Sequence, residues 1–396
     1  MADRRAADWH AATKLVHGGV ERSQHGELSE ALFLTQSYVY PNAEAAEARF
    51  TGADPGYVYS RYANPTVRMF EERMMLLEGA EDARATASGM AAVTVALMAL
   101  LRAGDHIVSA RALFGGCLYV VEDFLPRFGV TSTLVDGKDL DAWRAAVRPN
   151  TKAFFLESPT NPTLELVDIA AVAKIAHDAG AKLVVDNVFA TPLQQHPLQL
   201  GADVVAYSAT KHIDGQGRCL GGVVLGDAKY IDAVHSILKN TGPSMSPFNA
   251  WVLLKGLETL PLRVERQTAN AAILADAIAA HPAVVRVLYP GRKDHPQYDL
   301  AQRQMTGAST MIAFEVKGGR AEAFRVENAL RLISISNNLG DSKSIITHPP
   351  TTTHQRLTPE ARARLGIGEG MLRLSVGLED VRDLVEDITA GLDTLL

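Results

Sequence analysis

The chain has 396 residues, of which 47% are hydrophobic and 21% charged, and its 39 basic and 45 acidic residues give a formal net charge of −6. This balance is typical of a globular protein of more than one domain and excludes a disordered, collagen-like or disulfide-scaffold chain. The acidic excess predicts no nucleic-acid partner. The longest apolar run, residues 91–101, is too short for a membrane span, so we expect no membrane partner.

The two cysteines, Cys117 and Cys219, are too few for a disulfide framework. Two isolated thiols favour a reducing compartment. The N-terminal segment also lacks the apolar stretch that a signal peptide needs. The sequence therefore predicts a cytoplasmic protein, and we predict no metal site in it.

The first segment of the chain, residues 1–62, is polar and poor in periodic apolar positions. Turn signals occur at Pro41-Asn42 and at Asp54-Pro55-Gly56. We predict that this segment is an arm that contacts a neighbouring subunit. The rest is predicted to divide into a domain at 63–255 and a second domain at 256–396.

Residues 63–255 alternate between helical patterns and short apolar runs. Helices are predicted at 65–77, 89–101, 117–128 and 169–179, and strands at 106–109, 131–135, 153–156, 182–185, 204–207 and 221–225. Short, nearly continuous apolar strands between helices are typical of a parallel sheet that is covered on both faces. We therefore predict an α/β fold for this domain.

The pattern changes after about residue 228. A long helical region is predicted from 231 past 280, interrupted near 241–243. Strands are predicted at 284–288, 311–316, 332–336 and 372–376, with helices between and after them. This arrangement predicts a smaller α+β domain at the C-terminal end.

Polar side chains follow two of the predicted strands directly. Asp186 comes after 182–185, and Ser208, Thr210 and Lys211 come after 204–207. Ligands of open α/β sheets bind beyond the carboxyl ends of the strands. A lysine amine can form a Schiff base with an aldehyde cofactor, and a carboxylate can keep a pyridine nitrogen protonated. The same residue types predict a site for pyridoxal 5′-phosphate (PLP).

Other segments supply what the rest of this cofactor requires. Ser88-Gly89-Met90 opens an apolar helix, whose free N–H groups and the nearby hydroxyls suit a phosphate. Phe114 can cover the ring. Taken alone, each of these residues is as well explained by a helix cap, a turn or a solvated side chain. Their occurrence together favours the cofactor site.

The chain resembles the PLP-dependent enzymes of cysteine and methionine metabolism, the cystathionine γ-synthase family, over nearly its whole length. The matching motifs are Tyr59-Ser60-Arg61-Tyr62-Ala63-Asn64-Pro65-Thr66, Ser88-Gly89-Met90-Ala91-Ala92, Glu157-Ser158-Pro159-Thr160-Asn161-Pro162, Val185-Asp186-Asn187 and Tyr207-Ser208-Ala209-Thr210-Lys211-His212. The resemblance implies PLP as cofactor and the type I fold of PLP-dependent transferases. It also implies a homotetramer built as a dimer of dimers.

The resemblance implies a role for each matching residue. Lys211 is implied as the Schiff-base lysine and proton carrier, and Asp186 as the partner of the pyridine nitrogen. Phosphate contacts are implied for Gly89, Met90, Ser208 and Thr210, and for Tyr59 and Arg61 of a neighbouring subunit. Phe114 is implied to stack on the ring, in place of the commoner tyrosine, and Asn161 to lie near the 3′-oxygen. The substrate contacts are assigned to Arg373, for the α-carboxylate, and to Asn338.

The segment from Ser336 to Ser344 resembles the sulfhydrylase branch of the family, and the compact length resembles its O-succinylhomoserine enzymes. This implies γ-replacement with sulfide to give homocysteine and succinate, a step of methionine biosynthesis. Lys343 and Arg49 are cations that could recognise the succinyl carboxylate. Cystathionine γ-synthase activity with cysteine, and γ-elimination as in methionine γ-lyase, are the alternatives. Cys117 weakly resembles a lyase feature. A non-catalytic PLP-binding protein is disfavoured by the joint presence of Lys211, Asp186 and Arg373.

Overall fold

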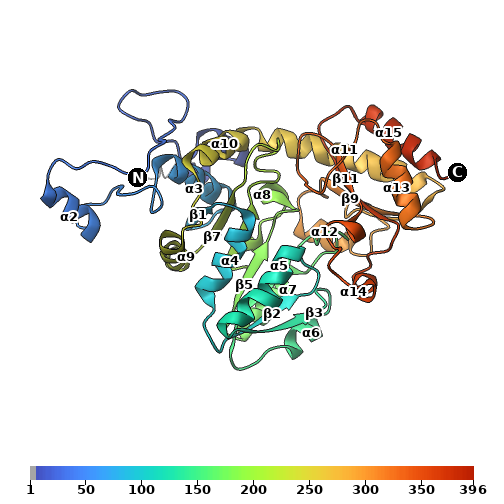
Figure 1. Cartoon of the computed structure of the whole chain (residues 1–396), viewed down its shortest axis with the longest axis horizontal. Coiled ribbons are helices and arrows are strands. Elements are labelled where there is room, and N and C mark those ends of the chain that lie inside the picture. Colours follow the sequence, from blue (N-terminus) through green and yellow to red (C-terminus); the bar gives the residue numbers. More distant parts are fainter. Residues whose placement is uncertain (1–5) are drawn as a thin grey trace.

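The computed structural model describes residues 6–396, and two sheets organise it (Figure 1). The larger sheet has seven strands in the order β1-β7-β6-β5-β4-β2-β3. Its strands are β1 (Asp82–Thr86), β2 (His106–Ala110), β3 (Thr131–Val135), β4 (Thr151–Glu157), β5 (Lys182–Asp186), β6 (Val204–Ser208) and β7 (Gly222–Gly226). Only β7 runs antiparallel to its neighbours β1 and β6, and the other pairs are parallel.

Helices cover both faces of this sheet. They are α3 (Pro65–Glu78), α4 (Gly89–Leu100), α5 (Gly115–Tyr119), α6 (Leu140–Ala145), α7 (Ile169–Asp178), α8 (Thr191–Gln194), α9 (Ala228–Thr241) and α10 (Pro247–Glu258). In β6, Val204 and Ala206 join the core formed with α4, α7 and α9, whereas Val205 and Tyr207 join the core formed with α3 and α10. Successive side chains of a strand point to opposite faces of the sheet. Because helices cover both faces, β6 is a continuous apolar run rather than an alternating one. The prediction of a mostly parallel α/β sheet between helices is confirmed.

The smaller sheet has five strands in the order β10-β11-β12-β9-β8. Its elements are α11 (Leu260–Ala280), β8 (Val284–Leu288), α12 (Tyr298–Gln304), β9 (Met311–Val316), α13 (Arg320–Ala329), β10 (Ser334–Ile335), β11 (Ile345–Thr347), α14 (Pro359–Arg364), β12 (Met371–Ser375) and α15 (Val381–Asp393). The helices α11, α13 and α15 enclose a separate apolar core against this sheet. Figure 1 shows α11 extending from the larger sheet toward this unit.

The N-terminal segment carries α1 (Ala11–His17) and α2 (Ala43–Thr51), and α2 lies far from both sheets in Figure 1. Arg73 of α3 anchors the segment: its Nη2 atom donates to Glu30 Oε1 at 2.6 Å and its Nε atom to the Gly18 carbonyl at 3.0 Å. Beyond this anchor several apolar side chains are largely exposed, among them Leu34, Val39 and Phe50. The arm is therefore held to the body at its base.

Two predicted elements differ from the structure, and two strands of the structure were not predicted. The helix predicted at 117–128 is α5 followed by a π-helical turn over Val120–Phe124 and a 3₁₀ turn over Leu125–Phe128, because Pro126 cannot donate an N–H to an α-helical ladder. The strand predicted at 332–336 shortens to β10, and strands β1 and β11 were not predicted. Within residues 6–396, no helix has both the length and the apolar character for crossing a membrane.

Candidate active site

A cavity of about 410 Å³ opens beyond the carboxyl ends of β4, β5 and β6, next to β12 of the smaller sheet. It is the place where the sheet-edge rule puts a ligand. It brings together the predicted residues Gly89, Met90, Phe114, Asn161, Asp186, Ser208, Thr210, Lys211, Asn338 and Arg373. These residues come from segments up to 284 positions apart in the chain, from Gly89 to Arg373.

Asp186 ends β5 at the floor of the cavity and is buried. Burial raises the pKa of its carboxyl to about 6, against the lowering effects of the Val188 N–H, the Cys117 thiol and the charge of Lys211. The Val188 N–H donates to Oδ1 at 3.1 Å, and Cys117 Sγ lies 3.9 Å from Oδ2. Cys117 is therefore a buried neighbour of Asp186, and burial raises the pKa of its thiol well above the ordinary range.

Lys211 lies in the loop between β6 and β7, and its Nζ atom donates to Asn338 Oδ1. Burial and, to a smaller extent, the positive charge of Arg373 lower the pKa of this amine to about 8, while Asp186 opposes the shift. A lysine with this pKa has a useful neutral fraction near neutral pH. The neutral amine is the form that attacks a carbonyl or accepts a proton.

An anion cradle forms where α4 begins. Ser88 caps the helix by accepting the Ala91 N–H at 3.2 Å, so the first N–H groups, at Gly89 and Met90, have no acceptor within the helix. A side chain at position 89 would bring its Cβ within 2.4 Å of Ser208 Cβ, so only glycine lets α4 approach β6 this closely. The Thr210 hydroxyl pairs with the Gly221 backbone at the same edge.

Arg373 projects from β12 and is almost fully buried. Its Nη1 atom donates to Asn161 Oδ1 at 2.9 Å, and its Nη2 atom donates to the carbonyls of Asn337 and Asn338 at 2.9 and 3.1 Å. Among residues 6–396, its buried Nε atom finds no hydrogen-bond partner. Burial lowers the pKa of the guanidinium to about 10, so it stays charged at neutral pH, with donor capacity left for an anionic ligand.

Sequence reasoning missed several residues of the cavity. Glu157 ends β4 directly beside Asp186 of β5, so the sheet-edge rule that found Asp186 also applies to it. Asn337 and Thr353 also line the cavity. They come from irregular segments, and no periodic pattern marks them.

Other predicted residues lie outside this cavity. Tyr59 and Arg61 line a separate surface hollow with residues 34–36 and 244–247, and the Arg61 guanidinium lies 5.4 Å from the centre of the Tyr59 ring. Lys343 is 71% exposed and pairs with Asp341, and Arg49 pairs with Asp54 near α2. Neither of these cations lines the cavity of its own subunit.

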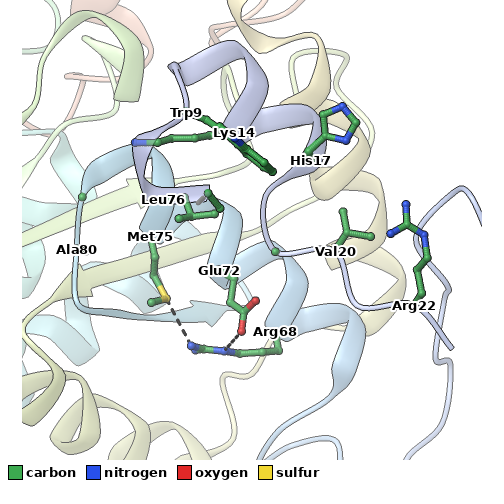
Figure 2. Close-up of a pocket in the computed structure, with 13 residues that line it drawn as sticks. Trp9, Lys14, His17, Val20, Arg22, Arg68, Glu72, Met75, Leu76 and Ala80 are labelled. Atoms are coloured by element: carbon green, nitrogen blue, oxygen red, sulfur yellow. Dashed lines mark hydrogen bonds and ion pairs between the residues drawn. The ribbon is translucent and has the colours of Figure 1, made fainter. Parts of the chain in front are cut away.

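Figure 2 shows a further cavity, between α1 and α3, that holds none of the predicted site residues. Arg68, one of the cations that line this cavity, is paired with Glu71, Glu72 and Asp82. Glu72, a carboxylate that lines this cavity, is thus taken up by its ion pair with Arg68. The chemistry therefore centres on the cavity of Lys211 and Asp186.

The residues of this cavity fit PLP. They offer an amine for its aldehyde, a buried carboxylate for its ring nitrogen, and helix N–H groups with hydroxyls for its phosphate. Phe114, 39% exposed, offers an aromatic face at the rim. The unpartnered Arg373 Nε atom leaves donor capacity for the carboxylate of an amino acid.

Comparison with known proteins gives the same assignment. The family described as "Cys/Met metabolism PLP-dependent enzyme" matches residues 12–393. O-succinylhomoserine sulfhydrylases of Mycobacterium tuberculosis and Pseudomonas aeruginosa are 55% and 52% identical, covering 96% and 97% of this chain and 95% of each relative. The L-methionine gamma-lyase of Porphyromonas gingivalis is 42% identical over 97% of both chains.

A solved structure agrees in fold and in cofactor. The metY protein of Campylobacter jejuni, which contains N′-pyridoxyl-lysine-5′-monophosphate, superposes with a TM-score of 0.93 at 31% identity. The match covers 97% of this chain and all of that chain. A match of this extent includes both sheets and the cavity between them. The chain belongs to the Cys/Met metabolism family of PLP-dependent enzymes.

Proposed function

We propose that this enzyme catalyses γ-replacement on O-succinyl-L-homoserine, with sulfide as nucleophile, to give L-homocysteine and succinate. The observation that carries the proposal is the sequence identity of 55% and 52% with two O-succinylhomoserine sulfhydrylases, over nearly the full length of the chain. The placement of Lys211, Asp186 and Arg373 around one cavity supports catalysis on an amino acid. The reaction is a step of methionine biosynthesis.

The bound cofactor supplies an aldehyde and an electron-withdrawing ring. In the proposal Lys211 holds the cofactor through its amine, and Asp186 keeps a proton at the ring nitrogen. The N–H groups of Gly89 and Met90 and the hydroxyls of Ser208 and Thr210 bind the phosphate. Phe114 covers one ring face, and Asn161 lies by the 3′-oxygen.

The substrate contacts follow from the same geometry. Arg373 binds the α-carboxylate with the donor capacity that the protein leaves free. The Lys211 amine, once released, would remove a proton from the α-carbon and then one from the β-carbon as succinate leaves the γ-carbon. After sulfide has added at the γ-carbon, Lys211 would return a proton to each of the two carbons. Asn338 accepts a hydrogen bond from this amine and so holds it near the substrate. Phe114 has no hydroxyl, so proton transfer is assigned to Lys211 alone.

Tyr59 and Arg61 are proposed to complete the phosphate site of a neighbouring subunit. Their distance from the cavity of their own chain, and the exposure of the arm, support this assignment. The active protein is then at least a dimer, and the family resemblance extends this to a homotetramer. The two isolated thiols favour a cytoplasmic location. The division at residues 62 and 255 remains a prediction.

The alternative with a specific observation behind it is γ-elimination, since L-methionine gamma-lyases of 38–43% identity are also relatives. Cys117 lines the cavity with its buried thiol 3.9 Å from Asp186 Oδ2, and this placement does not distinguish elimination from replacement. Cystathionine formation from cysteine is the other competing reaction, and it requires room for a second amino acid in the cavity.

A competition assay tests the proposal. The PLP-loaded enzyme is given O-succinylhomoserine with sulfide and cysteine together, and the products are identified by mass spectrometry. Homocysteine and succinate are expected as the main products. Cystathionine as the main product assigns the synthase activity instead, and 2-oxobutyrate from substrate or methionine assigns the lyase activity. A parallel reaction with O-acetylhomoserine tests the preference for the succinyl ester.

A further inference from the structure

Glu157 has no role in the reaction described so far, yet its carboxylate contacts two separate segments that carry residues of the site. Only 3% of the residue is exposed. Its Oε2 atom accepts the Phe114 N–H at 2.8 Å, and its Oε1 atom accepts the Asn161 N–H at 2.7 Å. The two donors belong to segments that are otherwise far apart in the chain. Both oxygens of one side chain therefore serve as backbone acceptors.

The two segments carry different parts of the site. Phe114 precedes α5 and offers the aromatic face at the cavity rim. Asn161 is linked to Arg373, whose Nη1 atom donates to its side-chain oxygen at 2.9 Å, and the Asn161 carbonyl is 3.2 Å from His354 Nε2. One carboxylate thus connects the ring-covering segment with the guanidinium of Arg373 through three hydrogen bonds.

The chemistry of the contacts demands a carboxylate. A backbone N–H can only donate, so each of the two positions needs an acceptor, and a carboxylate has two. An amide of the same shape has a single acceptor oxygen, and its NH₂ group would face the second N–H without a hydrogen bond. Leaving a buried donor unpaired costs about 1–3 kcal/mol.

The charges around Glu157 oppose one another. Burial and the neighbouring Asp186 carboxylate raise the pKa of Glu157 well above its ordinary value, while the two N–H groups and the positive charge of Arg373 act against this rise. Glu157 in turn raises the pKa of the Arg373 guanidinium, which burial lowers. The two N–H groups and Arg373 thus favour the charged form of Glu157, which accepts at both oxygens.

We propose that Glu157 is a positioning residue, which holds the segment of Phe114 and the Asn161–Arg373 pair in register with one another through both of its oxygens. The proposal rests on the assigned roles of Phe114 and Arg373 in the proposed function. It predicts that loss of one acceptor loosens both segments and weakens the binding of amino acids. It does not depend on the leaving group or the nucleophile.

The test uses the PLP-loaded Glu157→Gln enzyme, with Glu327→Gln as the matched control. Glu327 is also a buried carboxyl, but it lies on α13 and lines no part of the cavity. Hydrogen exchange followed by mass spectrometry is measured over residues 111–119, 158–166 and, as internal reference, α7. The equilibrium binding of L-norleucine, which has no γ-leaving group, is measured through the cofactor absorbance.

We expect exchange at least about tenfold faster in both segments of Glu157→Gln, unchanged exchange in α7, and L-norleucine affinity about tenfold weaker, the effect of one lost buried hydrogen bond. The control should match the wild type. Faster exchange in one segment alone, faster exchange throughout the chain, or unchanged affinity would overturn the proposal. These outcomes are independent of the competition assay, so either proposal can fail while the other stands.

A second variant guards against misfolding. Glu157→Asp keeps the charge but is one methylene shorter, so it cannot reach both N–H groups at once. The same pair of segments should exchange faster in it, with a smaller loss of affinity than in Glu157→Gln. If neither variant folds with bound cofactor, Glu157 is a structural residue of the core and the positioning role is wrong.

Discussion

A lysine that must be neutral to react gains from being buried beside a fixed positive charge. Burial and Arg373 together bring the pKa of Lys211 to about 8, from an ordinary value of 10.5. At pH 7 about a tenth of such amines are neutral, compared with well under a thousandth of ordinary lysines. The residue is therefore prepared for reaction before any ligand arrives.

This pKa predicts how the cofactor-free protein takes up PLP. The rate of uptake should rise with pH and level off above a midpoint near 8, because only the neutral amine attacks the aldehyde. Stopped-flow absorbance measures the rate. The Lys343→Ala protein, which lacks an exposed amine, should give the same profile, and Lys211→Ala should form no Schiff-base band and show no turnover. A rate still rising steeply between pH 9 and 10.5 would contradict the assignment.

Substitution of Arg373 should change the KM values of the two substrates differently. Lysine at this position keeps the charge but loses the planar fork, including the donors to Asn161 and to the carbonyls of Asn337 and Asn338. The KM for O-succinylhomoserine should rise roughly 10- to 100-fold, as expected for a lost charge-assisted hydrogen bond. The KM for sulfide, which has no carboxylate, should stay within about twofold. Steady-state kinetics on Arg373→Lys with each substrate varied in turn checks this, and an equal rise in both values would argue against a carboxylate role.

At the scale of elements, α3 is tied to the arm by an ion pair that water does not reach. Arg73 is fully buried and Glu30 is 6% exposed, with Lys255 donating to the second Glu30 oxygen at 2.9 Å. Burial alone would raise the pKa of Glu30, but the hydrogen bonds from Arg73 and Lys255 lower it overall. Because the folded-state pKa is lowered, this contribution to stability is present above pH 4.5 and is lost as the pH falls.

Removal of one member of this ion pair should lower the free energy of unfolding. Glu30→Ala leaves the buried Arg73 charge with only the longer ion pair to Glu258 at 3.8 Å, and we expect the free energy of unfolding to fall by about 3 kcal/mol. Denaturant titration at pH 7 measures the loss, and at pH 3 the difference from the wild type should shrink. The control is Glu44→Ala, an exposed residue of α2, which should change the free energy by less than about 0.5 kcal/mol. A loss below 1 kcal/mol for Glu30→Ala would mean that the arm is anchored otherwise.

Elements also show how far the sequence predicts the fold. Strands β5 and β6 were predicted within a residue, because each is a short apolar run closed by polar residues. The helix α3 was predicted because Asn64 caps it, Pro65 starts it and Gly79 ends it with a positive φ. Strand β1 escaped prediction because it reads Asp-Ala-Arg-Ala-Thr, with Asp82 and Arg84 charged, and gains its place only by pairing with β7.

The residues of the candidate site also fall into those that the sequence predicts and those that it does not. Asp186, Ser208 and Lys211 were predictable because they follow strands whose ends meet at one edge of the sheet. Asn337 and Thr353 were not, because long-range packing of the smaller sheet brings them to the cavity. The family resemblance added Arg373, which as an isolated arginine in a strand would have been interpreted as a structural ion pair.

At the scale of the whole molecule, the proposed sharing of Tyr59 and Arg61 between subunits predicts complementation. Lys211→Ala and Arg61→Ala subunits should each be inactive or nearly so. Mixed after mild dissociation, they should recover activity of up to about a quarter of the wild type, because half of the random dimers carry one intact site. Activity after mixing, with size-exclusion light scattering to verify assembly, is the measurement. If mixing restored nothing while mixed assemblies formed, the arm would act within its own chain.

The antiparallel strand β7 has a consequence for how the protein is made. Strand β1 leaves the ribosome near residue 86 but has no partner until residues 222–226 have followed, and Gly222 must then lie against the backbone of Ser88. During that interval a strand edge and the apolar helix α4 are exposed, which is a situation that favours aggregation. Slow translation through this interval would lengthen that exposure. The same late pairing brings α4 to Ser208, so the nascent chain acquires its anion cradle only when the larger sheet closes.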